Sequence, residues 1–293
     1  MGVKISREKW GYIFVIPGVL WYGLFMLYPM YYAIILSAHR WMGIETNPLF
    51  VGLDNFKEIF TDSLFYKSTV NTFYFTFISV SLTTFTALFI AILLTKVIKL
   101  RAIYRTFYFL PSVAGVVAVG IIWTWCYQPT FGLFNRILQV LHLPPSRWIM
   151  DPRLALFCVA ITQAWMRLGF NVIVFLAGLL TIPEQFYDAA KVDGASGFHQ
   201  LIHITLPLAR PIITFLLIYN TIYGLTVFGE VYMLTEGGPG SATYTVAYLM
   251  YETAFRYSRM GKGSAMALFL FVIILVITVI QMKFFERRTQ IEY

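Results

Sequence analysis

Long runs without charged side chains dominate this 293-residue sequence. Four runs contain no Asp, Glu, Lys or Arg: 10–39, 68–95, 106–135 and 263–282. Two more contain a single charge each, Arg167 within 154–183 and Glu230 within 211–235. Every run can supply the ~20 apolar residues that cross the hydrocarbon core of a bilayer. The pattern therefore predicts six transmembrane helices, at 12–38, 70–95, 103–127, 154–180, 211–234 and 264–284.

Composition points to the same class of protein. Hydrophobic residues make up 59% of the chain and charged residues 12%, against roughly 25% charged residues in soluble domains. So few charges cannot cover a water-soluble surface. The first apolar run is much longer than the ~7–15-residue core of a signal peptide, so we expect a retained anchor. We predict an all-α polytopic membrane protein in which residues 1–293 form one transmembrane domain.

The net charge of +8 follows membrane topology. Segments 1–10, 96–105 and 283–293 together carry 10 basic residues in 31 positions, whereas the loops 40–67, 128–153 and 236–262 carry 9 in 81. The denser set marks the cytoplasmic side of a membrane protein. We therefore expect both termini in the cytoplasm, a location in the inner or plasma membrane, and no nucleic-acid partner.

One inward connection, 181–211, is more patterned than a simple loop. Its sequence is TIPEQFYDAAKVDGASGFHQLIHITLPLARP. A helix-favouring start precedes Gly194, and a second helical stretch runs from there toward Pro207 and Pro211. Glycine permits a tight turn, and proline disfavours continuation of a helix. The segment is expected to form an L-shaped hairpin of two short helices.

This hairpin carries a family resemblance. In order and spacing, its residues resemble the EAA motif of binding-protein-dependent ABC importer permeases: Asp188-Ala189-Ala190, Asp193-Gly194-Ala195, Phe198 and Ile204-Thr205-Leu206-Pro207. Asp188 departs from the Glu most common in the family but keeps the charge. A second stretch, VYMLTEGGPG at 231–240, is similar to the end of the fifth span in maltose-type and glycerol-phosphate-type sugar permeases.

The resemblance implies that the hairpin docks on a separate ATPase subunit and converts its closure into movement of the spans. The residues expected to couple to that ATPase are Asp188, Ala189, Ala190, Asp193, Gly194, Ala195, Phe198, Leu206 and Pro207. The resemblance also implies a second permease subunit as heterodimer partner, two ATPase subunits that bind ATP and Mg²⁺, and an external solute-binding protein. No cofactor is expected on this chain.

Chemistry-bearing motifs are weak, so no catalytic residue is predicted. The string Gly261-Lys262-Gly263-Ser264 lacks the spacing of a P-loop and a preceding strand. His199 and His203 stand at i and i+4 like a metal-binding pair, but no third ligand is near, and a solvated or interfacial helix face is the preferred interpretation. Cys126 and Cys158 fall within predicted spans, where a packing role is expected.

Polar groups inside the spans are the candidates for a translocation path, because such groups are costly in lipid. The fourth and fifth predicted spans supply Gln163, Trp165, Arg167, Asn171, Asn220, Tyr223, Thr226 and Glu230. Hydrogen-bonding groups and aromatic faces are the chemistry that binds sugars. Alternatively, Arg167 and Glu230 form a buried ion pair that holds the bundle together.

Two outward loops contain short amphipathic stretches. Residues 52–60 are expected to form a helix entered through Asp54, with Phe56, Ile59 and Phe60 on one face. Within 134–141, apolar residues at helical spacing suit a helix that lies on the membrane surface. Packing against the helix bundle is the alternative for both.

Together, these features predict a permease subunit that imports a carbohydrate by alternating access, with the lipid bilayer as its solvent. Glycerol phosphate or another small polar solute is an alternative cargo, since Arg167 suits a phosphate. A membrane-embedded enzyme would be expected to show a motif such as H-E-x-x-H or paired acids, and the sequence shows neither. A channel or secondary carrier would be expected to show a filter-like loop or an internal repeat, and neither is evident.

Overall fold

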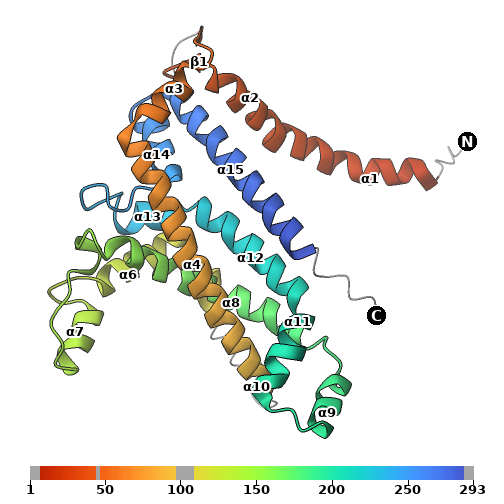
Figure 1. Cartoon of the computed structure of the whole chain (residues 1–293). Helices are drawn as coiled ribbons and strands as arrows, with labels where there is room; N and C mark the ends of the chain where they lie inside the picture. The colour runs from red at the N-terminus through yellow and green to blue at the C-terminus, as the bar shows by residue number, and fades with distance from the viewer. Residues whose placement is uncertain (1–6, 44–46, 97–108, 287–293) are drawn as a thin grey trace, which may run out of the picture. The chain divides into compact units, whose positions relative to one another are not determined.

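The computed structural model describes residues 7–43, 47–96 and 109–286 of the chain. Helices account for nearly all regular structure in these residues (Figure 1). The strands β1 (His39–Arg40) and β2 (Leu49–Phe50) form one short antiparallel pair. The all-α architecture is as predicted.

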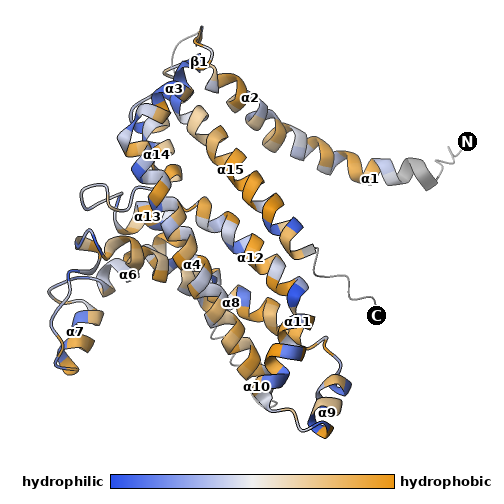
Figure 2. Ribbon diagram, in the orientation of Figure 1, coloured by the Kyte–Doolittle hydropathy of each residue, from blue (hydrophilic) through white to orange (hydrophobic). Residues whose placement is uncertain are grey.

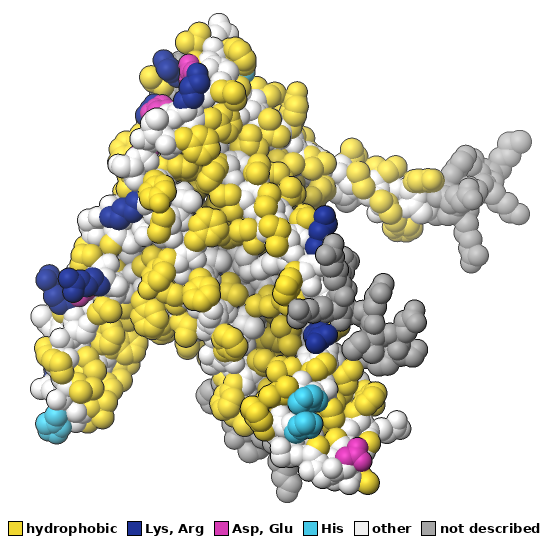
Figure 3. Space-filling view, viewed as in Figure 1, with side chains coloured by type: hydrophobic (Ala, Val, Ile, Leu, Met, Phe, Trp, Pro, Cys, Tyr) yellow, Lys and Arg dark blue, Asp and Glu magenta, His cyan; other side chains and the backbone are white. Residues whose placement is uncertain are grey.

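Four helices of the described chain are long and apolar enough to cross a membrane: Gly11–Ser37, Ser63–Thr95, Ala155–Leu179 and Met260–Phe285. They match the expected spans 12–38, 70–95, 154–180 and 264–284. A fifth candidate joins Gly197–Leu208 to Arg210–Leu225 through a bend of 69°. Hydrophobic residues run along these helices in Figure 2, and hydrophobic side chains are spread widely over the face shown in Figure 3. A total of six spans stays a prediction.

The third and fifth expected spans differ from single straight helices. Residues 103–108 of the third lie outside the described part, and its helix is interrupted at Ala114 and Gly115 before α6 (Val116–Cys126). The fifth divides into α12 (Arg210–Leu225) and α13 (Gly229–Leu234). The Thr245 hydroxyl donates to the Val227 carbonyl at 2.9 Å, so a residue from a later segment takes an acceptor at the break.

The helix α13 packs closely on α6. A Cβ atom added at Gly120 would lie 2.6 Å from the Met233 Cβ atom. This distance is too short for two carbon atoms, so any larger residue at position 120 would force the helices to shift. A Cβ at Gly229 would likewise press on Val116, at 3.1 Å. Small residues at a helix crossing allow backbones in membrane proteins to approach. These two glycines therefore set the distance between the elements.

The chain divides into two compact units. The first combines residues 1–63 with 250–271. It contains α1 (Arg7–Tyr22), the π-helical segment η1 (Gly23–Leu27), α2 (Tyr28–Ser37), the strand pair, α3 (Asp54–Thr61), η4 (Glu252–Arg256) and the start of α15 (Met260–Glu286). The buried Asn55 side chain donates to the Ser37 and His39 carbonyls, at 2.8 and 2.9 Å, and so ties α3 to the end of α2.

Charged side chains fasten α3 to the start of α15. Lys262 is buried and contacts Glu58 at 3.2 Å and Asp62 at 2.9 Å, while Arg259 contacts Glu58 at 2.6 Å. Burial alone would raise the pKa of the Glu58 carboxyl, but the hydrogen bonds from Arg259 and Lys262 outweigh burial and lower that pKa below 4.5. As expected, α3 begins at Asp54, and the Asp54 carboxylate pairs with Lys57 at 3.1 Å.

The second unit combines residues 64–249 with 272–293. Its other described elements are α4 (Ser63–Lys96), α7 (Leu133–Val140), the 3₁₀ turn η2 (Trp148–Met150), α8 (Ala155–Leu179), α9 (Glu184–Val192), α10 (Gly197–Gln200), the π-helical η3 (Leu201–Thr205), α11 (Leu206–Leu208) and α14 (Val246–Tyr251). One hydrophobic cluster includes Phe75, Tyr127 and Tyr248; another includes Phe175 and Leu216. Because α8 supplies side chains to both clusters, it links the two halves of the core.

Candidate functional site

Residues 184–208 form two helical arms that meet at Gly194, as the sequence predicts. Gly194 has a φ of +74°, a conformation that glycine adopts at little cost. Its N–H donates to the Lys191 carbonyl at 3.0 Å, and the Ala195 N–H donates to the Ala190 carbonyl at 2.8 Å. These bonds cap the end of α9 and send the chain into the second arm.

Side-chain bonds hold the two arms together. The Tyr187 hydroxyl on α9 lies 3.0 Å from the Thr205 hydroxyl on the second arm. Gln200 donates to the Ala195 carbonyl at 3.1 Å, and Ser196 accepts from the His199 N–H at the start of α10. The hairpin is therefore a braced element rather than a loose loop.

The outer surface of the hairpin carries both polar and apolar side chains. Among the residues expected to couple to an ATPase, Asp188, Ala189, Asp193, Gly194 and Phe198 are exposed. The others, Ala190, Ala195, Leu206 and Pro207, are half-buried. The Phe198 ring is 72% exposed, so an aromatic side chain stands open on the second arm. The surface offers apolar contact area with carboxylates beside it.

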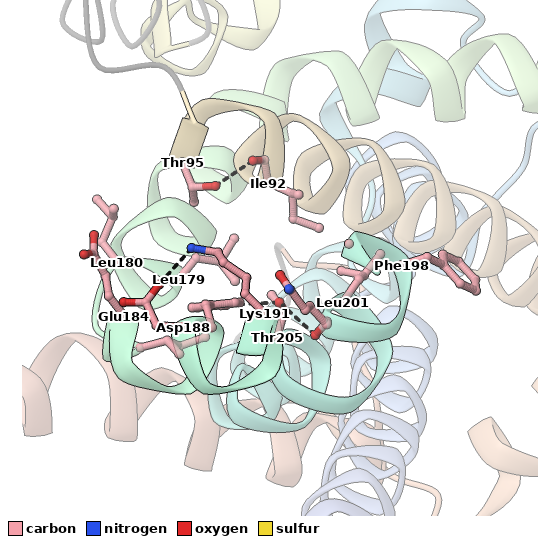
Figure 4. A pocket seen from close by; sticks show the side chains of 14 residues that line it. Ile92, Thr95, Leu179, Leu180, Glu184, Asp188, Lys191, Phe198, Leu201 and Thr205 are labelled. Atoms are coloured by element: carbon pink, nitrogen blue, oxygen red, sulfur yellow. Dashed lines mark hydrogen bonds and ion pairs between the residues drawn. The ribbon is translucent and has the colours of Figure 1, made fainter. Parts of the chain in front are cut away.

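A pocket of about 790 Å³ lies between the arms and the ends of α4 and α8. Figure 4 shows Ile92 and Thr95 of α4 across from Glu184, Asp188 and Lys191 of α9. Lys191 binds Asp188 at 2.8 Å, and this contact raises the pKa of the exposed lysine. The sequence identified the hairpin but not this pocket, because the end of α4 is distant in the chain.

The paired histidines of the second arm stack on each other. The His199 and His203 ring centroids are 3.9 Å apart with planes 20° apart, and the His203 ring contacts the His199 carbonyl. No group of three or more His, Cys, Asp or Glu residues in the described ranges is placed to hold a metal ion.

Polar side chains within the helices of the second unit bond one another. The Ser79 hydroxyl donates to the Gln163 side-chain carbonyl at 2.6 Å, and the Gln163 amide donates to Glu230 at 3.4 Å. All three residues are buried. The network joins α4, α8 and α13. Ser79 is not among the residues predicted from the sequence, where its only signal is a hydroxyl in an apolar helix.

Asn171 and Asn220 form a reciprocal amide pair. Asn220 donates to Asn171 at 2.7 Å, and Asn171 donates back at 3.3 Å. Asn220 also lies 3.4 Å from the Thr84 hydroxyl. Buried amides that satisfy each other cross-link membrane helices. The pair therefore joins α8 to α12 and leaves these amides engaged.

Arg167 and Tyr223 form a second contact between α8 and α12. The guanidinium carbon lies 3.5 Å from the centre of the Tyr223 ring, a cation–π geometry. Two more aromatic rings extend this contact into a row. The Tyr219 ring centroid lies 4.6 Å from that of Tyr223, and the Phe170 ring centroid lies 4.9 Å from that of Tyr219. Tyr219 and Phe170 were missed because an aromatic residue in an apolar span carries no distinct signal.

The ion pair considered between Arg167 and Glu230 does not form: Glu230 contacts Gln163, and the arginine covers Tyr223. The buried Nε atom of Arg167 has no hydrogen-bond partner among the described residues. Asn220, Tyr223 and Thr226, three candidates for the translocation path on the fifth predicted span, differ in exposure. Asn220 is buried, whereas Thr226 is exposed and Tyr223 is 38% exposed.

Comparison with known proteins agrees with this architecture. Residues 59–291 match the family model for the binding-protein-dependent transport system inner membrane component. A trehalose/maltose transport system permease protein of Thermococcus litoralis is 35% identical, covering 96% of this chain and 95% of that protein. An arabinooligosaccharides transport system permease protein of Bacillus subtilis is 32% identical, over 95% and 89%.

A glycerol-3-phosphate transport system permease protein of Agrobacterium fabrum is 30% identical, covering 94% of each chain. The fold is also that of a bacterial alginate ABC transporter crystallised with an alginate-bound periplasmic protein, with a TM-score of 0.85 and 23% identity over 98% of this chain and 97% of that one. The chain belongs to the family of binding-protein-dependent transport system inner membrane components.

Proposed function

We propose that this chain is the permease subunit of an ATP-driven importer that carries a carbohydrate across the membrane by alternating access. The observation that carries the cargo assignment is the row of Arg167, Tyr223, Tyr219 and Phe170 on α8 and α12. Aromatic faces pack on the C–H surface of a sugar ring, and the phenol and guanidinium groups bond its hydroxyls. The names of the trehalose/maltose and arabinooligosaccharide relatives support the same class of cargo.

The energy source is assigned to other subunits. ATP and Mg²⁺ bind two ATPase subunits, and this chain hydrolyses nothing. The exposed, braced hairpin around Gly194 docks on one ATPase subunit and moves with it. A second permease subunit completes the path as heterodimer partner.

The proposed transport cycle uses these contacts. A loaded external binding protein docks on the outward side, and closure of the ATPase pair moves the hairpins. The helices α8 and α12 then expose the aromatic row to the released sugar. Both termini and Gly194 lie in the cytoplasm. No bond in the sugar is made or broken.

The aromatic row is tested by Tyr223→Ala in the complete transporter reconstituted in liposomes. Loss of the ring and hydroxyl is expected to cost ~1–3 kcal/mol of sugar binding, which is seen as a higher apparent KM for uptake. ATPase stimulation by the loaded binding protein should persist. Phe77→Ala is the matched control, because Phe77 is an exposed aromatic residue of α4. Wild-type uptake by the Tyr223→Ala variant would show that the aromatic row does not line the translocation path.

An anionic cargo is a second candidate, favoured by one specific observation. Arg167 has no carboxylate contact among the described residues, and its buried Nε lacks a partner there. A phosphate or carboxylate on the solute would supply both charge and acceptor. Arg167→Gln should abolish uptake of glycerol 3-phosphate if that class is carried, and alter uptake of a neutral sugar much less.

A further inference from the structure

The short helix α7 (Leu133–Val140) presents three different faces. At ~100° of rotation per residue, Phe134, Leu138 and Asn135 share one sector, and Leu133, Ile137, Val140 and Leu141 share the next. Arg136 and Gln139 occupy the remaining sector. The burial of the first two sets follows this division: the first is buried or half-buried, and the second is exposed.

The first face is anchored to the protein. The Asn135 side chain donates to the Pro129 and Ser146 carbonyls, at 2.7 and 2.8 Å, and accepts from the Trp148 indole at 2.8 Å. The Phe134 ring packs on Tyr127 and Trp148, with centroids 5.0 and 5.6 Å apart. The rotation of α7 about its own axis is therefore fixed.

The second face is apolar and uncovered. Val140 is 77% exposed and Leu141 60% exposed, and Leu133 and Ile137 are also exposed. Four neighbouring aliphatic side chains with this exposure form one apolar patch, and such a patch marks contact with an apolar neighbour. In a membrane protein the bilayer itself is such a neighbour.

The third face and its surroundings are basic. Segment 128–153 contains Arg136, Arg147 and Arg153 against a single acid, Asp151. Guanidinium groups suit the phosphates of lipid headgroups. The anchoring cluster contains Trp123, Tyr127 and Trp148, and Trp and Tyr concentrate at the boundary between hydrocarbon and water. The candidate membrane span of α8 begins at Ala155, soon after these aromatic residues.

We propose that α7 lies in the headgroup boundary of the bilayer and inserts Leu133, Ile137, Val140 and Leu141 among the lipid chains. The protein lies on one side of the helix, lipid beneath it, and water with phosphate groups above it. Since α8 runs from this region to the hairpin, the leaflet is the one opposite the hairpin. The assignment does not depend on which solute is carried.

Site-directed spin labelling tests this surface in the complete transporter. Single cysteines at Val140 and Gln139 are introduced with Cys126→Ser and Cys158→Ser, and the complex is placed in vesicles of equimolar phosphatidylcholine and phosphatidylglycerol. Oxygen reports on lipid, and a water-soluble nickel chelate reports on solvent. The two positions are adjacent and both are exposed, so they differ in the face they occupy.

The ratio of oxygen to nickel accessibility is expected to be several-fold higher at Val140 than at Gln139. The Val140 label should give a depth within ~5–10 Å of the headgroup level, as for interfacial helices. Equal nickel access at both positions would place the face in water and overturn the proposal. Exclusion of both reagents from Val140 would show instead that another protein covers it, which overturns the proposal equally.

Discussion

Gly194 adopts a backbone conformation that other residues reach at a cost. Its φ is +74°, yet a Cβ atom added there would meet no other group within 4 Å, so strain rather than collision opposes substitution. The same residue stands exposed at the junction of the two arms. A change at Gly194 therefore acts on the shape of the hairpin and on whatever docks against it.

We expect Gly194→Asp to abolish coupling while the chain stays inserted in the membrane. Asp tolerates the left-handed conformation better than most residues, so the main effect expected is the desolvation cost of a carboxylate at the docking surface. Stimulation of ATPase activity by the loaded binding protein is the measurement. Gly197→Ala is the control, because that exposed helical glycine also has open space around it. Full stimulation of ATPase activity in the Gly194→Asp variant would show that the hairpin does not couple ATP hydrolysis to transport.

Glu58 is expected to make the stability of the first unit depend on pH. Its pKa is lower when folded than its ordinary value of 4.5. Its stabilising contribution is therefore complete above the unfolded pKa and is lost as the pH falls through the folded pKa. Thermal unfolding of purified complex should show wild type losing more stability than Glu58→Gln across that acidic window. Glu184→Gln, which removes an exposed acid of the hairpin, should unfold like wild type. Parallel curves for wild type and Glu58→Gln would contradict the role of Glu58.

At the scale of elements, α8 and α12 are joined by a polar pair and an aromatic row. Long runs with a single charge each located these helices, and polarity within the runs selected Gln163, Arg167, Asn171 and Asn220. The sequence could not show that the two asparagines bond each other, because it does not give the rotation of one helix against another. The break after Leu225 was likewise hidden, since the hydroxyl at that break belongs to Thr245.

The asparagine pair makes a prediction about helix packing. Asn220→Ala leaves the Asn171 amide unpaired and should lower stability by ~0.6–2 kcal/mol, in the range of polar contacts between membrane helices. The double variant Asn171→Leu/Asn220→Leu removes both amides and should recover part of the loss. Thermal unfolding and uptake are measured together. Unchanged stability with a raised KM for sugar would make Asn220 a substrate contact rather than a link between helices.

The crossing of α6 and α13 leads to a second prediction about helix packing. Gly120→Val should destabilise the complex, because a Cβ atom meets Met233 at 2.6 Å, and overpacking typically costs ~1–3 kcal/mol. Adding Met233→Ala should restore stability in part. Gly115→Ala serves as control, since nothing lies within 4 Å of a Cβ atom added at that position. A neutral Gly120→Val would show that the two helices separate freely.

For the whole molecule, the sequence predicted the helical class, the hairpin and six spans, four of which correspond to long apolar helices among the described residues. Topology stays a prediction, and cysteine labelling from outside intact cells tests it. Exposed sites at Leu53 and Gly240, with the half-buried Ser146, should react with impermeant reagent, and Gly194 should not. Leu53 is used because its neighbour Asn55 is buried and bonded. Labelling of position 194 from outside would show that the orientation of the chain is the reverse of the one predicted.

Import by the reconstituted complex tests most directly whether this chain is the permease of an ATP-driven carbohydrate importer. This chain, its permease partner, the ATPase subunits and the binding protein are assembled in liposomes with a radiolabelled sugar that the binding protein retains. We expect accumulation of the sugar only with both ATP and the binding protein present, and none with Gly194→Asp. Accumulation without ATP, or no sugar import by the fully assembled wild-type complex, would contradict the assignment of this chain as the permease of an ATP-driven carbohydrate importer.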